Sequence, residues 1–548
     1  MGVPYYFKYL TTNIKDCVVS QIKNLPVILY LDFNSIIYEA KNNISVRSKD
    51  LDTCSKYNKK ILIEYAICNE VIVLLEKVVN SVDVKRLKIV YIAIDGAAPM
   101  AKIIQQRQRR FKTAFWTDSI QQIAEEESVE KKGINWDTNA ITPGTKFMER
   151  LCNHLDGYIS LIKNVNKNIE FILDSSKNFG EGEHKLLKYM DNHKVEHHNY
   201  QKVIYGLDAD LIILNLLRGY NMTYLYRETS YFPFQPDTPS NYLYMDVSVM
   251  RDSIVSEYWQ DGMDNKERLL IDYVFLTYLL GNDFLPNLFI LKIQQGGFEL
   301  LNELYINGFN KIKCHLVNKD LQIRMDFFQY ILSGLSKVED KILTEMFNDH
   351  RRFKPYLNPK FNNYERRTAL LNFYPTMMAE KDTVQIGHKG WRERFYNYWL
   401  ECDPDVFMIN GMCENFMEGL SWILQYYIKG CPSNDWYYKY PITPGIKDLL
   451  NYVGNVKDKY YKKEWIIENV DNDLWTIYQL MLAIPKSSIK CIPKNMRPII
   501  SHRFFWYLFP TSFKLKTLYK RYFHDCYAVL PRLENNIMNN IKKLILVQ

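Results

Sequence analysis

The chain has 548 residues, of which 47% are hydrophobic and 24% charged, and its formal net charge is +8. This composition excludes an intrinsically disordered protein, and the lack of any run of about 18 uncharged apolar residues argues against a membrane-spanning one. Ten cysteines without a CxxC pair argue against a zinc knuckle and against a secreted disulfide framework. Because the amino terminus also has no secretion signal, we expect a folded, soluble protein of the cytoplasm, with the nucleus not excluded.

Two apolar runs near the amino terminus predict buried strands. They cover Val27 to Phe33 and Leu87 to Ile94, with Asp32 close to the end of the first and Asp95 directly after the second. Residues 41–60 between them are polar and predict a loop. A single aspartate at a strand end is usually a helix cap or a turn residue. Its recurrence at successive strand ends favours a shared role.

A basic segment follows the second strand. Pro99 suits the first turn of a helix, and residues 102–112 contain five basic side chains and no acidic one. In a helix, steps of three and four bring several polar donors to one face, and forked donors of this kind suit a phosphate group. A solvated basic face and a nuclear-import run are the alternatives, but the adjacent Asp95 favours phosphate binding. The donors on this face are Lys102, Gln106, Arg109 and Arg110.

Two pairs of carboxylates mark the centre of the sequence. Glu181 and Glu183 lie in the segment GEGEHK and precede an amphipathic helix, while Asp208 and Asp210 lie in GLDAD after an apolar run at residues 203–205. Carboxylates crowded in this way repel one another, and a divalent cation is the usual means of neutralising them. In open α/β sheets, the carboxyl ends of the strands are the edge at which ligands bind. The pattern therefore predicts a metal centre at that edge.

One further acid completes this set. An apolar helix is predicted from Arg268 to Leu280 and stops at Gly281, which leaves Asp283 at its exit. Oxygen ligands without cysteine suit Mg²⁺ or Mn²⁺ rather than zinc. His184 is expected to be a structural donor or a phosphate contact rather than a ligand. The acids predicted to form the metal centre are Asp32, Asp95, Glu181, Glu183, Asp208, Asp210 and Asp283.

These patterns predict an α/β fold with a mixed, largely parallel central sheet flanked by helices. The region from about residue 365 onward is rich in aromatic residues and reads as mostly helical, and we expect it to pack on the sheet-containing part and to wall off its site. We therefore divide the chain into a catalytic region at residues 1–345 and a helical region at residues 365–548.

The order of six segments resembles the XRN family of 5′-to-3′ exoribonucleases. The segments are LDFNSIIY, AIDGAAPMAKIIQQRQRRFK, ITPGTKFM, GEGEHK, YGLDADLIIL and LLGNDFLP. The opening MGVPYYFKYL and the later WRERFYNYW, FMEGLSWILQYY and WYYKYP also look like that family, so the resemblance covers nearly the whole chain. The long carboxy-terminal extension of larger members is expected to be largely absent.

The resemblance implies a role for each candidate residue. The seven carboxylates match the family's metal ligands, and the basic set Lys102, Gln106, Arg109 and Arg110 matches its pocket for a 5′-terminal monophosphate. Tyr38 stands where the family has a histidine that stacks on the first base, and stacking requires only an aromatic face. Trp436 is a candidate for a second stacking surface. Met100 stands where members tend to carry arginine, which removes a positive charge near the pocket.

The implied activity is processive 5′-to-3′ degradation of single-stranded, 5′-monophosphorylated RNA to 5′-mononucleotides in RNA decay. The resemblance implies a PIN-like nuclease core, catalysis by two Mg²⁺ or Mn²⁺ ions and a monomeric protein. One alternative is a flap-type 5′ nuclease that acts on DNA, which GEGEHK and the late WYY segment disfavour. The other is a catalytically silent RNA-binding scaffold, which the retention of all seven carboxylates disfavours.

Overall fold

The computed structural model describes residues 2–47, 56–129, 136–165, 167–206, 208–232, 240–378, 380–465 and 470–547. A seven-stranded sheet lies at its centre, in the order β1-β7-β6-β5-β2-β3-β4. The five strands from β6 to β4 are parallel, while β7 and β1 are antiparallel to their neighbours. The strands are β1 (Val18–Val19), β2 (Val27–Asp32), β3 (Leu87–Ala93), β4 (Glu170–Asp174), β5 (Gln201–Tyr205), β6 (Thr223–Glu228) and β7 (Tyr242–Asp246).

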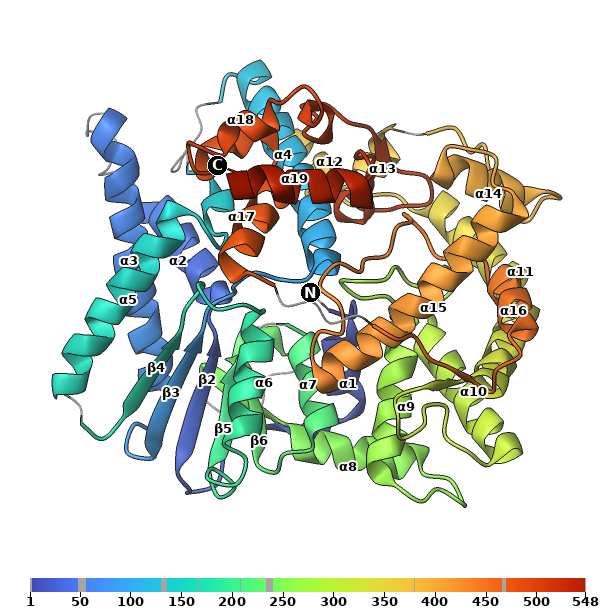
Figure 1. The fold of residues 1–548 in the computed structure, drawn as a ribbon, viewed down its shortest axis with the longest axis horizontal. Coiled ribbons are helices and arrows are strands. Elements are labelled where there is room, and N and C mark those ends of the chain that lie inside the picture. The colour runs from blue at the N-terminus through green and yellow to red at the C-terminus, as the bar shows by residue number, and fades with distance from the viewer. Residues whose placement is uncertain are drawn as a thin grey trace.

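The sheet is covered on both faces, which explains why its inner strands read as continuous apolar runs rather than as alternating ones. In β2, Ile28 and Tyr30 pack into one hydrophobic cluster, while Leu29 and Leu31 pack into the other. Helices α6 (Gly182–Asn192), α7 (Asp210–Arg218) and α8 (Val247–Tyr258) contribute to the first cluster, and α2 (Asn34–Arg47), α3 (Lys56–Ser81) and α5 (Lys146–Val165) to the second (Figure 1).

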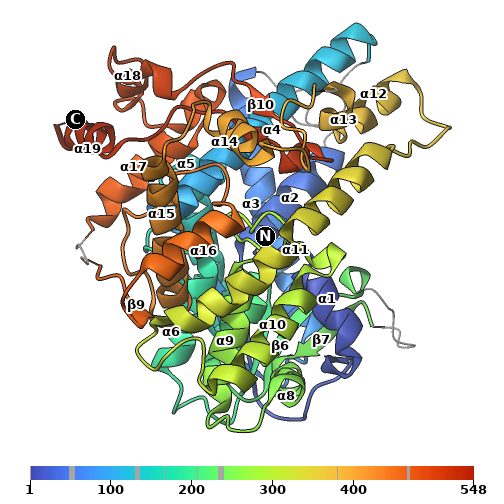
Figure 2. The ribbon, with the colours of Figure 1, turned by 90° about the vertical axis from the view of Figure 1, so that its right-hand side faces the viewer.

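Most of the helices that follow the sheet lie beside it, whereas the last ones, at the carboxy-terminal end, lie above it in the view of Figure 1 (Figures 1 and 2). The first hydrophobic cluster contains residues from Val3 to Leu518 and includes side chains of these helices. The helical region therefore shares a core with the sheet. The remaining helices are α1 (Tyr6–Asn13), α4 (Met100–Glu126), α9 (Lys266–Tyr278), α10 (Gly297–Ile312), α11 (Met325–Arg352), α12 (Asn363–Leu371), α13 (Tyr374–Met378), α14 (Trp391–Leu400), α15 (Val406–Lys429), α16 (Ile446–Asn455), α17 (Asn472–Ala483), α18 (Arg497–Ile500) and α19 (Asn535–Val547).

Two short ladders lie in the helical region, and they pair β8 (Ile323–Arg324) with β9 (Tyr460–Tyr461) and β10 (Leu515–Lys516) with β11 (Tyr527–Ala528). The predicted α/β class with a largely parallel sheet and a helical second half is confirmed. The division at residues 345 and 365 stays a prediction. None of the helices among the described residues combines the length and the apolar character that crossing a bilayer requires.

One local prediction was wrong. Residues 41–60 were expected to form a loop, but α2 extends to Arg47 and α3 begins at Lys56, with residues 48–55 outside the described part. Neither helix contains glycine or proline in its interior, so nothing in the backbone chemistry stops it. Polarity alone therefore misidentified exposed helix as loop.

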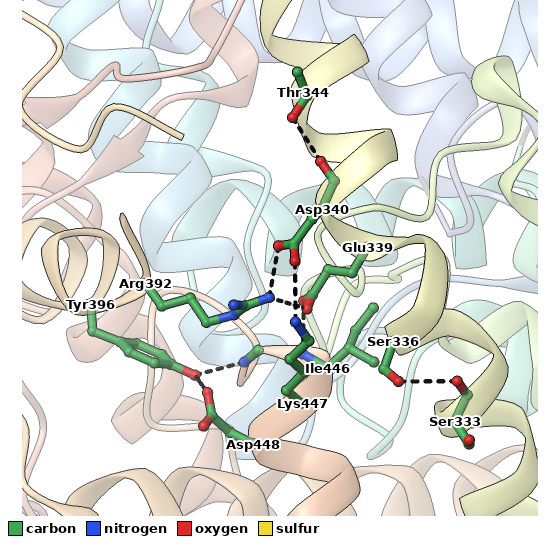
Figure 3. A network of polar contacts seen from close by, with 11 residues as sticks. Ser333, Ser336, Glu339, Asp340, Thr344, Arg392, Tyr396, Ile446, Lys447 and Asp448 are labelled. Carbon is green, nitrogen blue, oxygen red and sulfur yellow. Dashed lines mark hydrogen bonds and ion pairs between the residues drawn. The ribbon is translucent and has the colours of Figure 1, made fainter. Parts of the chain in front are cut away.

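A polar network joins three helices of the second half (Figure 3). Arg392 on α14 donates to the carboxylates of Glu339 and Asp340 on α11, at 2.6 and 3.0 Å. Glu339 also accepts from the backbone N–H of Ile446 at the start of α16, at 3.1 Å, and Lys447 pairs with Asp340 at 3.1 Å. The network therefore fixes α11, α14 and α16 to one another beside the shared core.

Candidate active site

The ends of neighbouring parallel strands bring the first two acids together. Asp32 ends β2 in register with Ala93 of β3, and Asp95 follows β3 by two residues. The backbone N–H of Gly182, the first residue of α6, donates to Asp95 Oδ1 at 2.7 Å. A β-carbon on Gly182 would lie 2.7 Å from Asp32 Oδ1, so a larger residue would not fit here. Both aspartates therefore meet the start of α6.

The paired carboxylates join them from α6 and α7. Glu181 occupies the N-cap position of α6 without a side-chain capping hydrogen bond, and Glu183 lies in the first turn of that helix, while Asp210 begins α7. Ligand atoms of Glu183, Asp208 and Asp210 lie within 4.8 Å of one another, and so do those of Glu181, Glu183 and His184. The structure thus places these acids in the arrangement that a cation site requires.

Lys102 on α4 connects the cluster to Asp283. Its Nζ lies 2.5 Å from Glu181 Oε2 and 2.8 Å from Asp283 Oδ2. Burial by itself would lower the pKa of Lys102, but the carboxylates of Asp283 and Glu181 hold it well above its ordinary value. The ammonium group is therefore a countercharge inside the acidic cluster. Its predicted role in phosphate binding stays a prediction.

The cluster carries more negative charge than Lys102 can balance. Burial, together with a smaller effect of repulsion from Asp95 and Asp208, raises the pKa of Asp32 to about 8. Burial and repulsion from neighbouring acids also raise the pKa values of Glu183 and Asp210. Asp210 is 1% exposed, and its Oδ1 has no hydrogen-bond partner among the described residues. Buried carboxylate oxygens left without donors are what a divalent cation satisfies, so these residues fit a site for such a cation.

The helical region contributes a side chain that the sequence did not single out. Tyr426 on α15 donates from its hydroxyl to Glu181 Oε1 at 2.6 Å, and its ring centroid lies 4.1 Å from that of His184. Burial lowers the pKa of His184 to about 4, so its imidazole is neutral near pH 7. The segment FMEGLSWILQYY contributes to the resemblance, but nothing in a single sequence marks which of its aromatic residues reaches the acids.

The predicted basic set is divided between different surroundings. Arg110 is 8% exposed, lies near Tyr38, and has an Nη1 atom without a hydrogen-bond partner among the described residues. Gln106 accepts from Gln479 of α17 at 3.3 Å, and Arg109 is exposed. An unsatisfied guanidinium beside an accessible aromatic ring is a suitable receptor for a phosphate next to a base. Arg107, from the same run, instead donates to backbone carbonyls of Leu482 and Leu508 and holds α4 in place.

The two candidate stacking residues and Met100 differ in how exposed their side chains are. Tyr38 is 37% exposed and open to a partner ring. Trp436 is 8% exposed and stacks on Trp422 with 5.2 Å between ring centroids, so one face is covered. Met100 is fully buried, and it packs with α17 residues such as Trp475 in a separate hydrophobic cluster. The stacking roles of Tyr38 and Trp436 stay predictions.

Comparison with protein families matches both halves of the chain. Residues 1–229 match the model of the XRN 5′-3′ exonuclease N-terminus, and residues 263–378 and 375–545 match the Xrn1 helical domain. The chain belongs to the XRN 5′-3′ exonuclease family. This confirms the resemblance predicted from the ordered segments. Six of the seven acids lie within the residues that match the exonuclease model, and Asp283 lies within those that match the helical domain.

Individual relatives of this XRN chain are distant but extensive. A 5′-3′ exoribonuclease 2 homolog of Drosophila melanogaster is 26% identical over 97% of this chain and 69% of its own length. The 5′-3′ exoribonuclease 1 of Saccharomyces cerevisiae is 26% identical over 91% of this chain and 40% of its own, and the human 5′-3′ exoribonuclease 1 is 25% identical over 82% and 29%. The similarity therefore covers the sheet and the helical region together.

Proposed function

We propose that this chain is a 5′-to-3′ exoribonuclease that degrades RNA in RNA decay. The observation that carries the proposal is the convergence of the seven predicted acids around Lys102, from the end of β2, the residues after β3, the starts of α6 and α7, and the loop after α9. A cluster of this composition hydrolyses phosphodiesters in many nucleases, because hard cations held by carboxylates neutralise the charge that develops on phosphate oxygens. The relatives are named as exoribonucleases of the same polarity.

We propose that the activity requires two metal ions held by the acids. The seven carboxylates would hold two Mg²⁺ or Mn²⁺ ions, which when bound activate water and stabilise the leaving 3′ oxygen. The chain's own residues orient the reaction around them: the Gly182 N–H fixes Asp95, and Tyr426 fixes Glu181. Lys102 balances part of the charge of Glu181 and Asp283.

Substrate selection is proposed to occur at the 5′ end. Arg110 and Arg109, with Gln106 and Lys102, would bind a single 5′-terminal phosphate, while Tyr38 stacks on the first base. By the resemblance to the family, a receptor that fits one phosphate would exclude capped and triphosphorylated ends. After each cleavage the new 5′-monophosphate would move to Arg110, which would make degradation processive. Helices of the second region that wall off the site would admit single strands only.

The test compares two RNAs that differ only in the 5′ group. We expect rapid release of mononucleotides from 5′-monophosphate RNA and at least about tenfold slower release from 5′-hydroxyl RNA, because each charge-assisted hydrogen bond is worth about 1.5–3 kcal/mol. Arg110→Gln should remove this preference, whereas Lys163→Gln on the exposed surface of α5 should retain it. Equal rates for both RNAs with the unchanged protein would remove the phosphate pocket from the proposal.

The two alternatives are separated by substrate and by turnover. A flap-type nuclease would cleave branched DNA faster than linear RNA, and a silent scaffold would bind RNA without releasing nucleotides. The intact carboxylate set favours an active enzyme, and the match to the helical domain favours linear RNA.

We further propose that the protein acts as a monomer in the cytoplasm. Size-exclusion chromatography would test the oligomeric state, and localisation of a tagged chain would test the compartment.

A further inference from the structure

Two tyrosines beside the acidic cluster have buried hydroxyl groups without a hydrogen-bond partner among the described residues. Tyr278 is the last residue of α9 and Tyr427 lies near the end of α15, and each side chain is 1% exposed or less. Their rings stack, with 5.6 Å between the centroids and 19° between the planes. Because a buried hydroxyl without a partner costs free energy, two of them on stacked rings indicate a polar group that both are placed to meet.

The neighbours of the stacked pair place it next to the acids. The ring centroid of Tyr427 lies 6.4 Å from that of His184, which follows Glu183, and 6.4 Å from that of Phe284 in the loop after α9. Helices α9 and α15 both pack against α7, whose first residue is Asp210. The pair therefore lies among α6, α7 and the loop after α9, the elements that carry most of the acids.

Asp210 is the acid whose charge acts on both hydroxyl groups. Burial, and to a smaller extent repulsion from Asp210, raises the pKa of Tyr278 well above its ordinary value. Burial with repulsion from Asp210 and Glu183 does the same for Tyr427, so both hydroxyls keep their protons near neutral pH and are available as donors. Asp210 Oδ1 is itself buried without a partner among the described residues. Two donors without an acceptor and an acceptor without a donor thus occur at one place.

The preceding residue of α15 shows what such a donor does. Tyr426, the neighbour of Tyr427, donates directly to Glu181 at 2.6 Å. A donor of this kind fixes the orientation of a carboxylate that binds a metal, and its loss typically weakens metal affinity by about 10–100-fold. Tyr278 and Tyr427 are placed to do the same for Asp210, on another side of the cluster.

We propose that the hydroxyls of Tyr278 and Tyr427 position Asp210 as a metal ligand by donating to its carboxylate through one ordered water molecule. Neither hydroxyl bonds to Asp210 directly. A water molecule accepts two hydrogen bonds and donates two, so one water can accept from both phenols and donate to Asp210. Both tyrosines are positioning residues, since they act through Asp210. This inference rests on the proposed metal-dependent function and adds the residues that orient one side of the metal centre.

The test compares tyrosine-to-phenylalanine variants by calorimetric titration with Mn²⁺ in the absence of RNA. We expect Tyr278→Phe and Tyr427→Phe each to raise the apparent Kd of Mn²⁺ about tenfold. The double variant should lose much less than the product of the two single effects, because both donors act through one water. Tyr478→Phe is the matched control. Tyr478 of α17 is also buried with an unpartnered hydroxyl among the described residues, but its charged neighbour is Asp435 rather than an acid of the cluster.

Metal rescue separates positioning from damage to the fold. At saturating Mn²⁺ the release of mononucleotides by Tyr278→Phe and Tyr427→Phe should return to the rate of Tyr478→Phe, whereas damage to the fold would persist. If one single variant is unfolded by circular dichroism, the other carries the test.

Three results would overturn the proposal: a Kd for Mn²⁺ in Tyr278→Phe and Tyr427→Phe equal to that of Tyr478→Phe, fully additive losses in the double variant, or no recovery at saturating Mn²⁺. If the unchanged protein binds Mn²⁺ but releases no nucleotides, the exoribonuclease function fails, while the Kd values still decide whether the tyrosines position Asp210. An unchanged protein that binds no Mn²⁺ overturns the inference whether or not it cleaves RNA.

Discussion

At the scale of single residues, the site is defined by how a few side chains balance the charge of the acids. Lys102 is a buried cation within the cluster, and Tyr426 is a neutral donor to Glu181 from a distant helix. Both reach the same carboxylate from opposite parts of the chain. Their removal should therefore change metal binding before it changes the fold.

The first prediction concerns the Tyr426 hydroxyl. Tyr426→Phe removes the 2.6 Å hydrogen bond to Glu181 and leaves the ring in place. We expect a loss of about 1 kcal/mol in unfolding free energy and a several-fold higher Mg²⁺ concentration for half-maximal activity, since Glu181 loses its orientation. Tyr438→Phe is the control, because Tyr438 is also buried but donates to the Ile442 carbonyl away from the acids. An equal Mg²⁺ requirement in both variants would contradict this role.

The second prediction concerns Lys102. Lys102→Met removes the ammonium that lies 2.5 Å from Glu181 and 2.8 Å from Asp283, so the metal-free variant should unfold several degrees lower. Added Mg²⁺ should raise the melting temperature of the variant more than that of the unchanged protein, because the ion replaces the missing countercharge. Differential scanning fluorimetry with and without Mg²⁺ measures this. A smaller Mg²⁺ effect in the variant would show that Lys102 is not the countercharge.

At the scale of helices and strands, the sequence predicted most of what positions the site. The apolar runs located β2 and β3, and Gly281 marked the end of the segment that leads to Asp283, because these signals are local. The sequence could not predict that the basic residues of α4 would have different surroundings. Periodicity placed Lys102 and Arg110 on one face, but α6 brings Glu181 to Lys102 and α2 brings Tyr38 to Arg110. Packing between distant elements leaves no mark on a single sequence.

The third prediction tests the network that joins α11, α14 and α16 (Figure 3). The Glu339 side chain is 4% exposed, so Arg392→Met leaves a buried carboxylate without its cation and should cost about 3 kcal/mol. Lys447→Met is the control, since it removes only the exposed pair with Asp340, worth about 0–1 kcal/mol. Urea denaturation compares the two. Similar losses of stability in both variants would show that the network does not fix these helices.

At the scale of the whole molecule, the helical region completes the nuclease site. Tyr426 from α15 reaches Glu181, and Gln479 from α17 accepts from the backbone N–H of Ala98 before α4 at 2.7 Å. The shared hydrophobic cluster joins the sheet and the helical region into one core. The site therefore depends on both regions, and the acids it collects make the stability of the metal-free protein depend on pH.

The fourth prediction follows from the raised pKa values. Asp32 titrates near its ordinary value of about 4 when unfolded, but its pKa is raised to about 8 by burial and by repulsion from Asp95 and Asp208. Between these two pH values the folded, metal-free protein binds more protons than the unfolded chain. The contribution of Asp32 to the free energy of unfolding is therefore complete below about pH 4 and is lost as the pH rises through about 8. Mg²⁺ should therefore raise the melting temperature more at about pH 8 than at about pH 6. An equal or smaller rise at the higher pH would contradict the account of the cluster.

The central claim is that the seven acids form the metal centre of a 5′-to-3′ exoribonuclease. A time course on 5′-monophosphorylated RNA, with Mg²⁺ and with a chelator, tests it most directly, with Asp208→Ala as the inactive comparison. We predict progressive release of 5′-mononucleotides only when Mg²⁺ is present and Asp208 is intact. Intact RNA after incubation with Mg²⁺, or equal release by Asp208→Ala, would contradict the account.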